Sequence, residues 1–216
     1  MKRAVAILVL AATGVMAAPV VPGLMGKHGL SESQKGRLLF SELRCVSCHA
    51  SESVQQKKGP DLSLVGSRVN PGYIQKFIVN PHSVDPGTQM PDLLAGNPKR
   101  DEIAEALTHF LVSRSGNPFD AGVVKQEEVD AGKKLFERIG CVNCHMPGKG
   151  VQLSHVPSKY GVDSLADFLF QPRHTRPSGR MPDMNLTREE AKSIASYLIG
   201  LKAVKLSEFE PEAAKI

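Results

Sequence analysis

The sequence predicts an all-α protein in which two small domains of three to five helices each follow one another along the chain. Three observations predict this architecture: a long internal repeat, apolar residues at helical spacing, and a short Cys-His motif that occurs once in each repeat. A chain of 216 residues is long enough for two such domains.

The first residues have the pattern of a secretory signal peptide. Lys2 and Arg3 form a positive start, residues 4–12 are apolar, and residues 15–17 supply the small side chains that signal peptidase requires. We therefore expect a signal peptide over residues 1–17 and a periplasmic or otherwise exported protein. An uncleaved membrane anchor is the alternative, but the apolar stretch of about 15 residues is short of the roughly 20 that cross a bilayer.

The rest of the chain repeats itself in three gapless blocks. Residues 36–49 align with 132–145, residues 59–92 with 150–183, and residues 107–111 with 194–198. The two copies differ in length only between these blocks, as expected for a duplicated domain. We expect an N-terminal linker over 18–30, a first domain over 31–113, a linker over 114–126, a second domain over 127–203 and a polar tail over 204–216.

Apolar spacing predicts three main helices in each copy. They cover residues 34–43, 73–79 and 99–113 in the first copy, and 129–139, 165–170 and 187–201 in the second. Pro81 and Pro172 should stop the two middle helices. Thr187 is the expected N-cap of the last helix, with Glu190 completing a capping box.

Each copy contains one C-x-x-C-H motif, the attachment signal of c-type haem. The motif residues are Cys45, Cys48 and His49 in the first copy and Cys141, Cys144 and His145 in the second. Two thiols three positions apart can reach the vinyl groups of one porphyrin, and the histidine then offers its imidazole to the iron. The motifs thus predict two covalently bound haem c groups. A zinc site, a thioredoxin-like redox pair and two disulfides are the competing interpretations.

Composition fits haem better than nucleic acid. The formal charge of +5 falls once Lys2 and Arg3 are removed, and haem propionates would bring it close to neutral. No basic stripe is interleaved with aromatic residues. The chain has no Trp and few aromatic residues, so a buried haem in each domain would supply much of the missing apolar surface.

The second axial ligand of each iron decides the chemistry of the haem. Met90 and Met181 occupy the same repeat position, each in a Met-Pro-Asp turn, so we predict that they bind the two irons together with His49 and His145. Met184 is the rival ligand in the second copy.

Bis-histidine ligation is the alternative, with His82 or His174 as the second ligand. Neither histidine is repeated in the other copy, and both are expected to be solvated loop residues. His109 is expected to be a surface or interface residue, and His28 and His155 have no counterpart in the repeat either.

Two supporting roles follow around each haem. The carbonyl of Pro60 is well placed to accept from Nδ1 of His49, and Val151 holds that position in the second copy. Arg68 and Lys159 are aligned with each other, and each could neutralise a haem propionate or be a solvated charge.

Each half resembles a class I cytochrome c domain, with Gly and Phe before C-x-x-C-H, then Gly-Pro-x-Leu, a Met-Pro loop and a final helix with an aromatic-Leu pair. Together they resemble the tandem di-haem cytochromes, among them cytochrome c4. The resemblance implies that the first and last helices cross where Gly36 and Phe40 meet Phe110, and where Gly132 and Phe136 meet Tyr197. Val151 and the shorter loop after His145 depart from the family pattern.

With His and Met on both irons, we expect one-electron transfer in a respiratory chain rather than catalysis. The expected partners are a donor dehydrogenase or reductase and an acceptor oxidase, steered by Arg44, Lys57, Lys58 and Lys99. A haem subunit of a larger oxidoreductase complex, peripherally associated with a membrane, is the first alternative. A di-haem peroxidase-like enzyme is the second.

Overall fold

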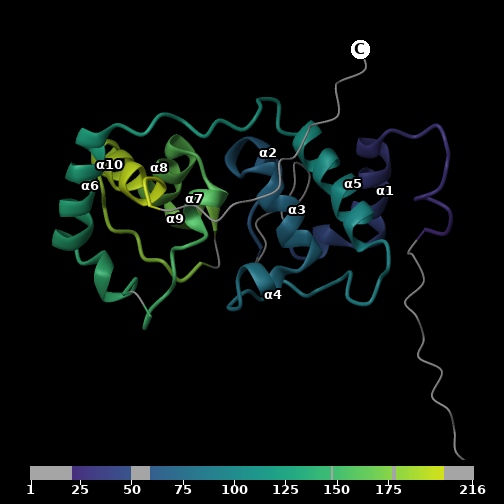
Figure 1. The fold of residues 1–216 in the computed structure, drawn as a ribbon, viewed down its shortest axis with the longest axis horizontal. Helices are drawn as coiled ribbons and strands as arrows, with labels where there is room; N and C mark the ends of the chain where they lie inside the picture. The colour runs from purple at the N-terminus through teal and green to yellow at the C-terminus, as the bar shows by residue number, and fades with distance from the viewer. Residues whose placement is uncertain (1–20, 50–58, 147, 177–178, 202–216) are drawn as a thin grey trace, which may run out of the picture.

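In the computed structural model, residues 21–49, 59–146, 148–176 and 179–201 are described, and every regular element among them is helical. The first half contains α1 (Glu32–Glu42), η1 (Cys45–Ser47), α2 (Val65–Arg68), α3 (Pro71–Val79), α4 (Pro81–Val84) and α5 (Arg100–Ser113). The second half contains α6 (Gln126–Arg138), η2 (Cys141–Asn143), α7 (Val156–Lys159), α8 (Val162–Phe170), α9 (Pro172–Thr175) and α10 (Arg188–Ile199). Figure 1 shows the two halves as separate helical lobes, which confirms the predicted fold class.

Side-chain caps fix where several helices begin. Ser31 starts α1 with a capping box in which Ser31 and Gln34 each satisfy the other's backbone N–H. Thr187 and Glu190 form the same arrangement at α10, as the sequence predicts. The counterparts of these helices in the repeat, α6 and α5, follow Lys125 and Lys99 without a side-chain cap, so the two domains cap different helices.

The prolines that were expected only to stop the middle helices also start new ones. α3 ends at Val79 and α8 at Phe170. After a single intervening residue, Pro81 and Pro172 open the short helices α4 and α9. Proline suits the first helical position because its missing N–H would have no intrahelical partner there. The chain therefore turns twice before it reaches each Met-Pro loop.

In each domain the first and last helices cross in direct contact. A Cβ placed on Gly36 would lie 1.9 Å from the carbonyl oxygen of Ala106, so only glycine allows α1 to approach α5 this closely. The rings of Phe40 and Phe110 pack beside the crossing with their centroids 5.3 Å apart. The crossing that the resemblance implied in the first domain is thus present.

The second domain repeats this crossing between α6 and α10. Gly132 lies as close to the carbonyl of Ser193 as Gly36 does to that of Ala106, and the centroids of Phe136 and Tyr197 are 5.6 Å apart. Both domains therefore keep their apolar core on the inner faces of two crossed helices.

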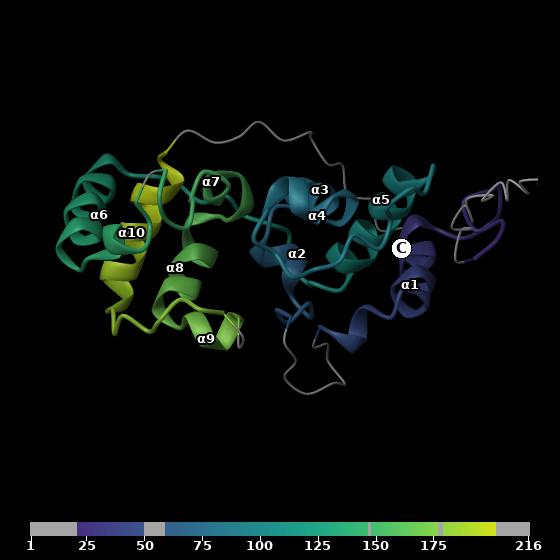
Figure 2. The same ribbon diagram turned by 90° about the horizontal axis from the view of Figure 1, so that it is seen from below.

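The two domains meet through α2 and α3 on one side and α7 and α8 on the other, as Figure 2 shows. Val69 and Tyr160 form an isolated antiparallel bridge, and the N–H of Asn70 donates to the carbonyl of Lys159 over 2.9 Å. Val69 and Tyr160 occupy the same position in the repeat. The contact therefore joins equivalent parts of the two domains.

Residues 114–125 connect the domains without forming a regular element, and Val123 on this segment is 78% exposed. No helix in the described part of the chain is long and apolar enough to cross a membrane. The expected signal peptide (1–17) and the whole of the expected polar tail (204–216) lie outside the described residues, as do Lys57 and Lys58.

Candidate haem attachment sites

Each Cys motif lies on a tight turn that follows a long helix. After α1 the backbone passes through the left-handed region at Arg44 (φ 53°), and after α6 it does so at Gly140 (φ 90°). The cysteines then open a single 3-10 turn, η1 or η2, and the N–H of each motif histidine donates to the carbonyl of its first cysteine over 3.0 Å. This turn gathers both thiols and the imidazole of each motif into one short segment.

All four cysteines are free thiols in this structure. Burial raises the pKa of Cys45 to about 11 and raises that of Cys141 as well, so both are protonated at neutral pH. A structural zinc site would need four ligands that converge on one ion. Among the described residues, no three His, Cys, Asp or Glu side chains are grouped so that they could hold a metal ion.

The ring of each motif histidine is held by one backbone carbonyl. Nδ1 of His49 lies 3.0 Å from the carbonyl oxygen of Pro60, and Nδ1 of His145 lies 3.0 Å from that of Val151. A carbonyl can only accept, so the proton sits on Nδ1 and leaves the Nε2 lone pair free for a metal. Burial also lowers the pKa of His49, which favours the neutral ligand form.

The loops that carry these two carbonyls are hydrogen-bonded to their Cys motifs at different positions of the repeat. In the first domain the N–H of Gly59 donates to Cys48 over 2.8 Å, whereas in the second the N–H of Val151 donates to Cys144 over 2.9 Å. A Cβ on Gly59 would lie 2.7 Å from Nδ1 of His49, so glycine is required there. The two imidazoles thus donate the same hydrogen bond to carbonyls on differently built loops.

The predicted methionine ligands are half-buried in both domains. The N–H of Met90 donates to the hydroxyl of Thr88 over 3.2 Å. In the second domain, Met181 and Met184 both pack against the core. The assignment of Met181 rather than Met184 therefore rests on its position in the repeat.

The two aligned cations predicted to face propionates have different surroundings. Arg68 is partly buried and donates to the carbonyl of Asp61. Lys159 is only 7% exposed, and its Nζ lies 5.2 Å from the ring centroid of Tyr73 and 5.0 Å from that of Tyr160. None of the ion pairs in the described structure includes Lys159. The side chain of Lys159 hydrogen-bonds to Tyr160, and the charge of Asp85 also favours its ammonium, so its role as a propionate partner stays a prediction.

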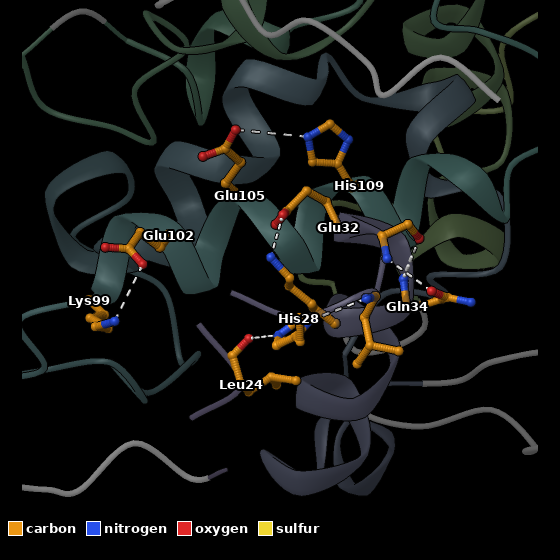
Figure 3. A network of polar contacts seen from close by, with 11 residues as sticks. Leu24, His28, Glu32, Gln34, Lys99, Glu102, Glu105 and His109 are labelled. Atoms are coloured by element: carbon orange, nitrogen blue, oxygen red, sulfur yellow. Dashed lines mark hydrogen bonds and ion pairs between the residues drawn. The ribbon is translucent and has the colours of Figure 1, made fainter. Parts of the chain in front are cut away.

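The remaining histidines lie in varied positions. His82 and His174 are exposed, as expected, but they lie in the short helices α4 and α9 and not in loops. His28 bonds to the carbonyl of Leu24 (Figure 3). His155 contacts the ring of Tyr73 across the domain boundary, a role that the sequence did not reveal.

His109 was expected at the surface or an interface, and this expectation is wrong. It is only 6% exposed, lies on α5, and its Nε2 is 3.9 Å from a carboxylate oxygen of Glu105 (Figure 3). Of the predicted steering cations that are described, Arg44 is exposed and Lys99 pairs with Glu102 on the surface of α5.

Large apolar side chains are exposed next to the site residues. They are Leu64 at 54%, Leu93 at 47%, Met146 at 46% and Val151 at 61%. Leu93 belongs to the Met90 loop, Met146 follows His145, and Val151 supplies the carbonyl for that histidine. Exposed apolar surface next to an attachment motif suits a large, flat, apolar cofactor. The donor set and its surroundings therefore fit a haem in each domain.

Two protein families match the chain, one in each half. Residues 33–115 match the family described as Cytochrome c. Residues 127–198 match the family described as Cytochrome C oxidase, cbb3-type, subunit III. No solved structure gives a significant match.

Two curated relatives share one name, that of a subunit of nitric oxide reductase. The protein of this name from Cereibacter sphaeroides is 33% identical over 86 residues, which cover 33% of this chain and 58% of the relative. The one from Paracoccus denitrificans is 27% identical over 97 residues, which cover 38% of this chain and 65% of the relative. The chain thus spans less than two thirds of the length of either relative.

Proposed function

We propose that this protein, whose two halves are cytochrome c domains, is a di-haem electron-transfer subunit of a larger membrane-bound oxidoreductase. The similarity to two proteins named as a subunit of nitric oxide reductase carries this proposal, because both names describe a part of a larger enzyme. A freely diffusing carrier, the main expectation from the sequence, has the same haem residues but no support from these relatives. Nothing in the comparisons favours a di-haem peroxidase.

Attachment in each domain uses the three motif residues. The thiols of Cys45 and Cys48 would hold one haem through thioether bonds at its two vinyl groups, and those of Cys141 and Cys144 would hold the other in the second domain. Once bound, the haem supplies a reversible one-electron change at its iron. His49 and His145 bind through Nε2, since the carbonyls of Pro60 and Val151 hold Nδ1–H.

Met90 and Met181 complete the ligand sets in this proposal. Thioether ligands raise the reduction potential and leave no open position for a substrate. Each domain then passes electrons without binding a reactant, so catalysis belongs to another subunit. Arg68 and Lys159 serve as partners for haem propionates, and Lys159, buried between two tyrosines, brings that charge to the domain boundary.

The cellular location belongs to the same proposal. Residues 1–17 act as an export signal, so that haem attachment and electron transfer take place in the periplasm. The membrane association then comes from the partner subunits.

The experiment is purification of tagged, haem-loaded protein from detergent-solubilised membranes of its native host. We expect two haems per chain in the wild type and one in the Cys45→Ala/Cys48→Ala or the Cys141→Ala/Cys144→Ala variant. We also expect a membrane-embedded oxidoreductase to co-purify, and its turnover with the physiological donor to stop in either single-haem variant. A haem-loaded protein that stays in the periplasmic fraction and leaves oxidoreductase turnover unchanged when deleted would contradict the subunit assignment.

A further inference from the structure

Arg100, at the start of α5, ties the Met90 loop to the end of α3. Its Nη2 donates to the carbonyl of Val79, the last residue of α3, and lies 3.2 Å from a carboxylate oxygen of Asp92. The two side chains are 27% and 21% exposed, so the ion pair is largely shielded from water. Asp92 follows Met90 by two residues, and the pair therefore fixes the chain just after the methionine.

Two further hydrogen bonds stiffen the same loop. The hydroxyl of Thr88 accepts from the N–H of Met90 over 3.2 Å, and Asp92 accepts from the N–H of Leu94 over 3.1 Å. Leu94 is buried at 2% exposure, which anchors the far end of the turn in the core. The loop is thus held before, at and after the methionine.

We call the contacts of Arg100 with Asp92 and with the carbonyl of Val79 the clamp. The second domain has the same Met-Pro-Asp turn but lacks these contacts. Gly179 stands where the first domain has Thr88, so this position offers no hydroxyl to the N–H of Met181. Asp183 is exposed and accepts only a local hydrogen bond, from the N–H of Asn185. Its carboxylate has no ion pair in the described structure.

The arginine at the start of α10, Arg188, points elsewhere, and the residue that aligns with Arg100 in the repeat is Thr187. It pairs with Asp167 over 3.3 Å and stacks on the ring of Phe170, with Cζ 4.4 Å from the centroid. Both members of this ion pair are more than two thirds exposed. Phe170 aligns with Val79, so Arg188 contacts α8 as Arg100 contacts α3, but it leaves the methionine loop free.

We propose that Arg100 is a positioning residue that holds Met90 on the first haem, and that the unclamped Met181 loop releases its methionine first. The second domain is then the one whose iron accepts a small exogenous ligand such as imidazole. This inference rests on the methionine ligation that is part of the proposed function. It goes beyond that function because it predicts which of the two methionine ligands, Met90 or Met181, leaves its haem iron first.

The test is imidazole titration of the oxidised, haem-loaded full chain. The readouts are the near-infrared charge-transfer band of methionine-ligated ferric haem and the hyperfine-shifted methionine methyl resonance of each haem. Met90→His and Met181→His each remove one methyl resonance and thereby assign the two. We expect the Met181 signal to disappear at a lower imidazole concentration than the Met90 signal.

The decisive variant is Asp92→Asn, which removes the charge of the clamp and keeps the shape of the side chain. Loss of a hydrogen bond to a charged group should raise the apparent imidazole affinity of the first haem about tenfold. Asp183→Asn is the matched control and should leave the second haem unchanged, while Asp92→Glu, which restores the carboxylate, should return most of the protection. Haem content and far-UV circular dichroism show that each variant is folded.

The outcomes separate this inference from the function on which it rests. Methionine signals that disappear together, or that of Met90 first, would overturn the order of lability. An unchanged first haem in Asp92→Asn would overturn the role of Arg100. Absence of both methionine signals in the untreated wild type would instead overturn the His-Met ligation in the proposed function.

Discussion

Replacing Gly36 by alanine tests whether the crossing of α1 and α5 holds the first domain together. The added Cβ would lie 1.9 Å from the carbonyl oxygen of Ala106 and 2.7 Å from Cβ of Phe110. Ordinary contact begins near 3.4 Å, so the two helices must separate by more than an ångström. That separation also disturbs the packing of Phe40 against Phe110, whose ring centroids are 5.3 Å apart.

The expected loss of stability follows from two opposing effects. Overpacking a well-packed core costs about 1–3 kcal/mol, and the upper end applies because the clash is with backbone rather than a flexible side chain. Alanine recovers roughly 1 kcal/mol in the helix interior relative to glycine. The net loss is about 2 kcal/mol, or on the order of 10 °C in the melting temperature of a domain of this size.

Differential scanning calorimetry of the haem-loaded Gly36→Ala protein measures this loss. Gly132→Ala is the matched variant in the second domain, where Cβ would lie 1.9 Å from the carbonyl of Ser193. Gly29→Ala is the control, since nothing lies within 4 Å of a Cβ there, and it should change stability by less than about 0.5 kcal/mol. If Gly36→Ala melts within the range of that control, the helices do not need their close approach, and the reasoning fails.

Three further predictions concern single residues. Val151→Pro, which copies Pro60 of the first domain, deletes the N–H that donates to the carbonyl of Cys144 and should destabilise the second domain by about 1–3 kcal/mol. A higher denaturant midpoint in this variant would contradict the prediction. Thr187→Ala should cost about 1 kcal/mol through loss of the α10 cap, measured by urea unfolding, whereas Thr187→Ser should cost little. Burial, joined by the charge of Lys159, lowers the pKa of His155 from 6.5 to about 4, so the unfolded chain takes up this proton first as the pH falls. Stability should therefore decrease between about pH 6.5 and pH 4 and change less in His155→Asn; equal slopes in both proteins would refute a buried neutral His155.

Much of the fold could be predicted from the sequence because it depends on local patterns. The capping box at Thr187 and Glu190 uses residues three positions apart, and the matched glycines and aromatic residues fit the close helix crossings. The prolines at 81 and 172 were expected to end helices, but proline is equally suited to a first helical position. Asn80 caps α4 with its side chain, whereas α9 begins at Pro172 without a side-chain cap, so the residue before the proline does not decide between the two.

The parts that escaped prediction depend on contacts between distant segments. His109 was expected outside because it is polar, yet α5 has buried residues on most of its circumference. Tyr73 and His155 are 82 positions apart, and the repeat gives no sign that they touch. The clamp at Arg100 was also missed, since nothing local distinguishes this arginine from Arg188.

The bridge between Val69 and Tyr160 gives the chain the geometry of a dimer fused into one polypeptide. An antiparallel contact between equivalent positions is what a two-fold axis produces, and in a homodimer each interface residue would have to suit its own copy. In a single polypeptide the two sides of the contact can have different residues. Lys159 lies over the ring of Tyr73, whose counterpart in the second domain is Ser164. In a symmetric homodimer this Lys–Tyr contact would have to occur on both sides of the axis or on neither. The boundary between the two domains can thus be asymmetric in charge and aromaticity, as an electron path with a defined direction requires.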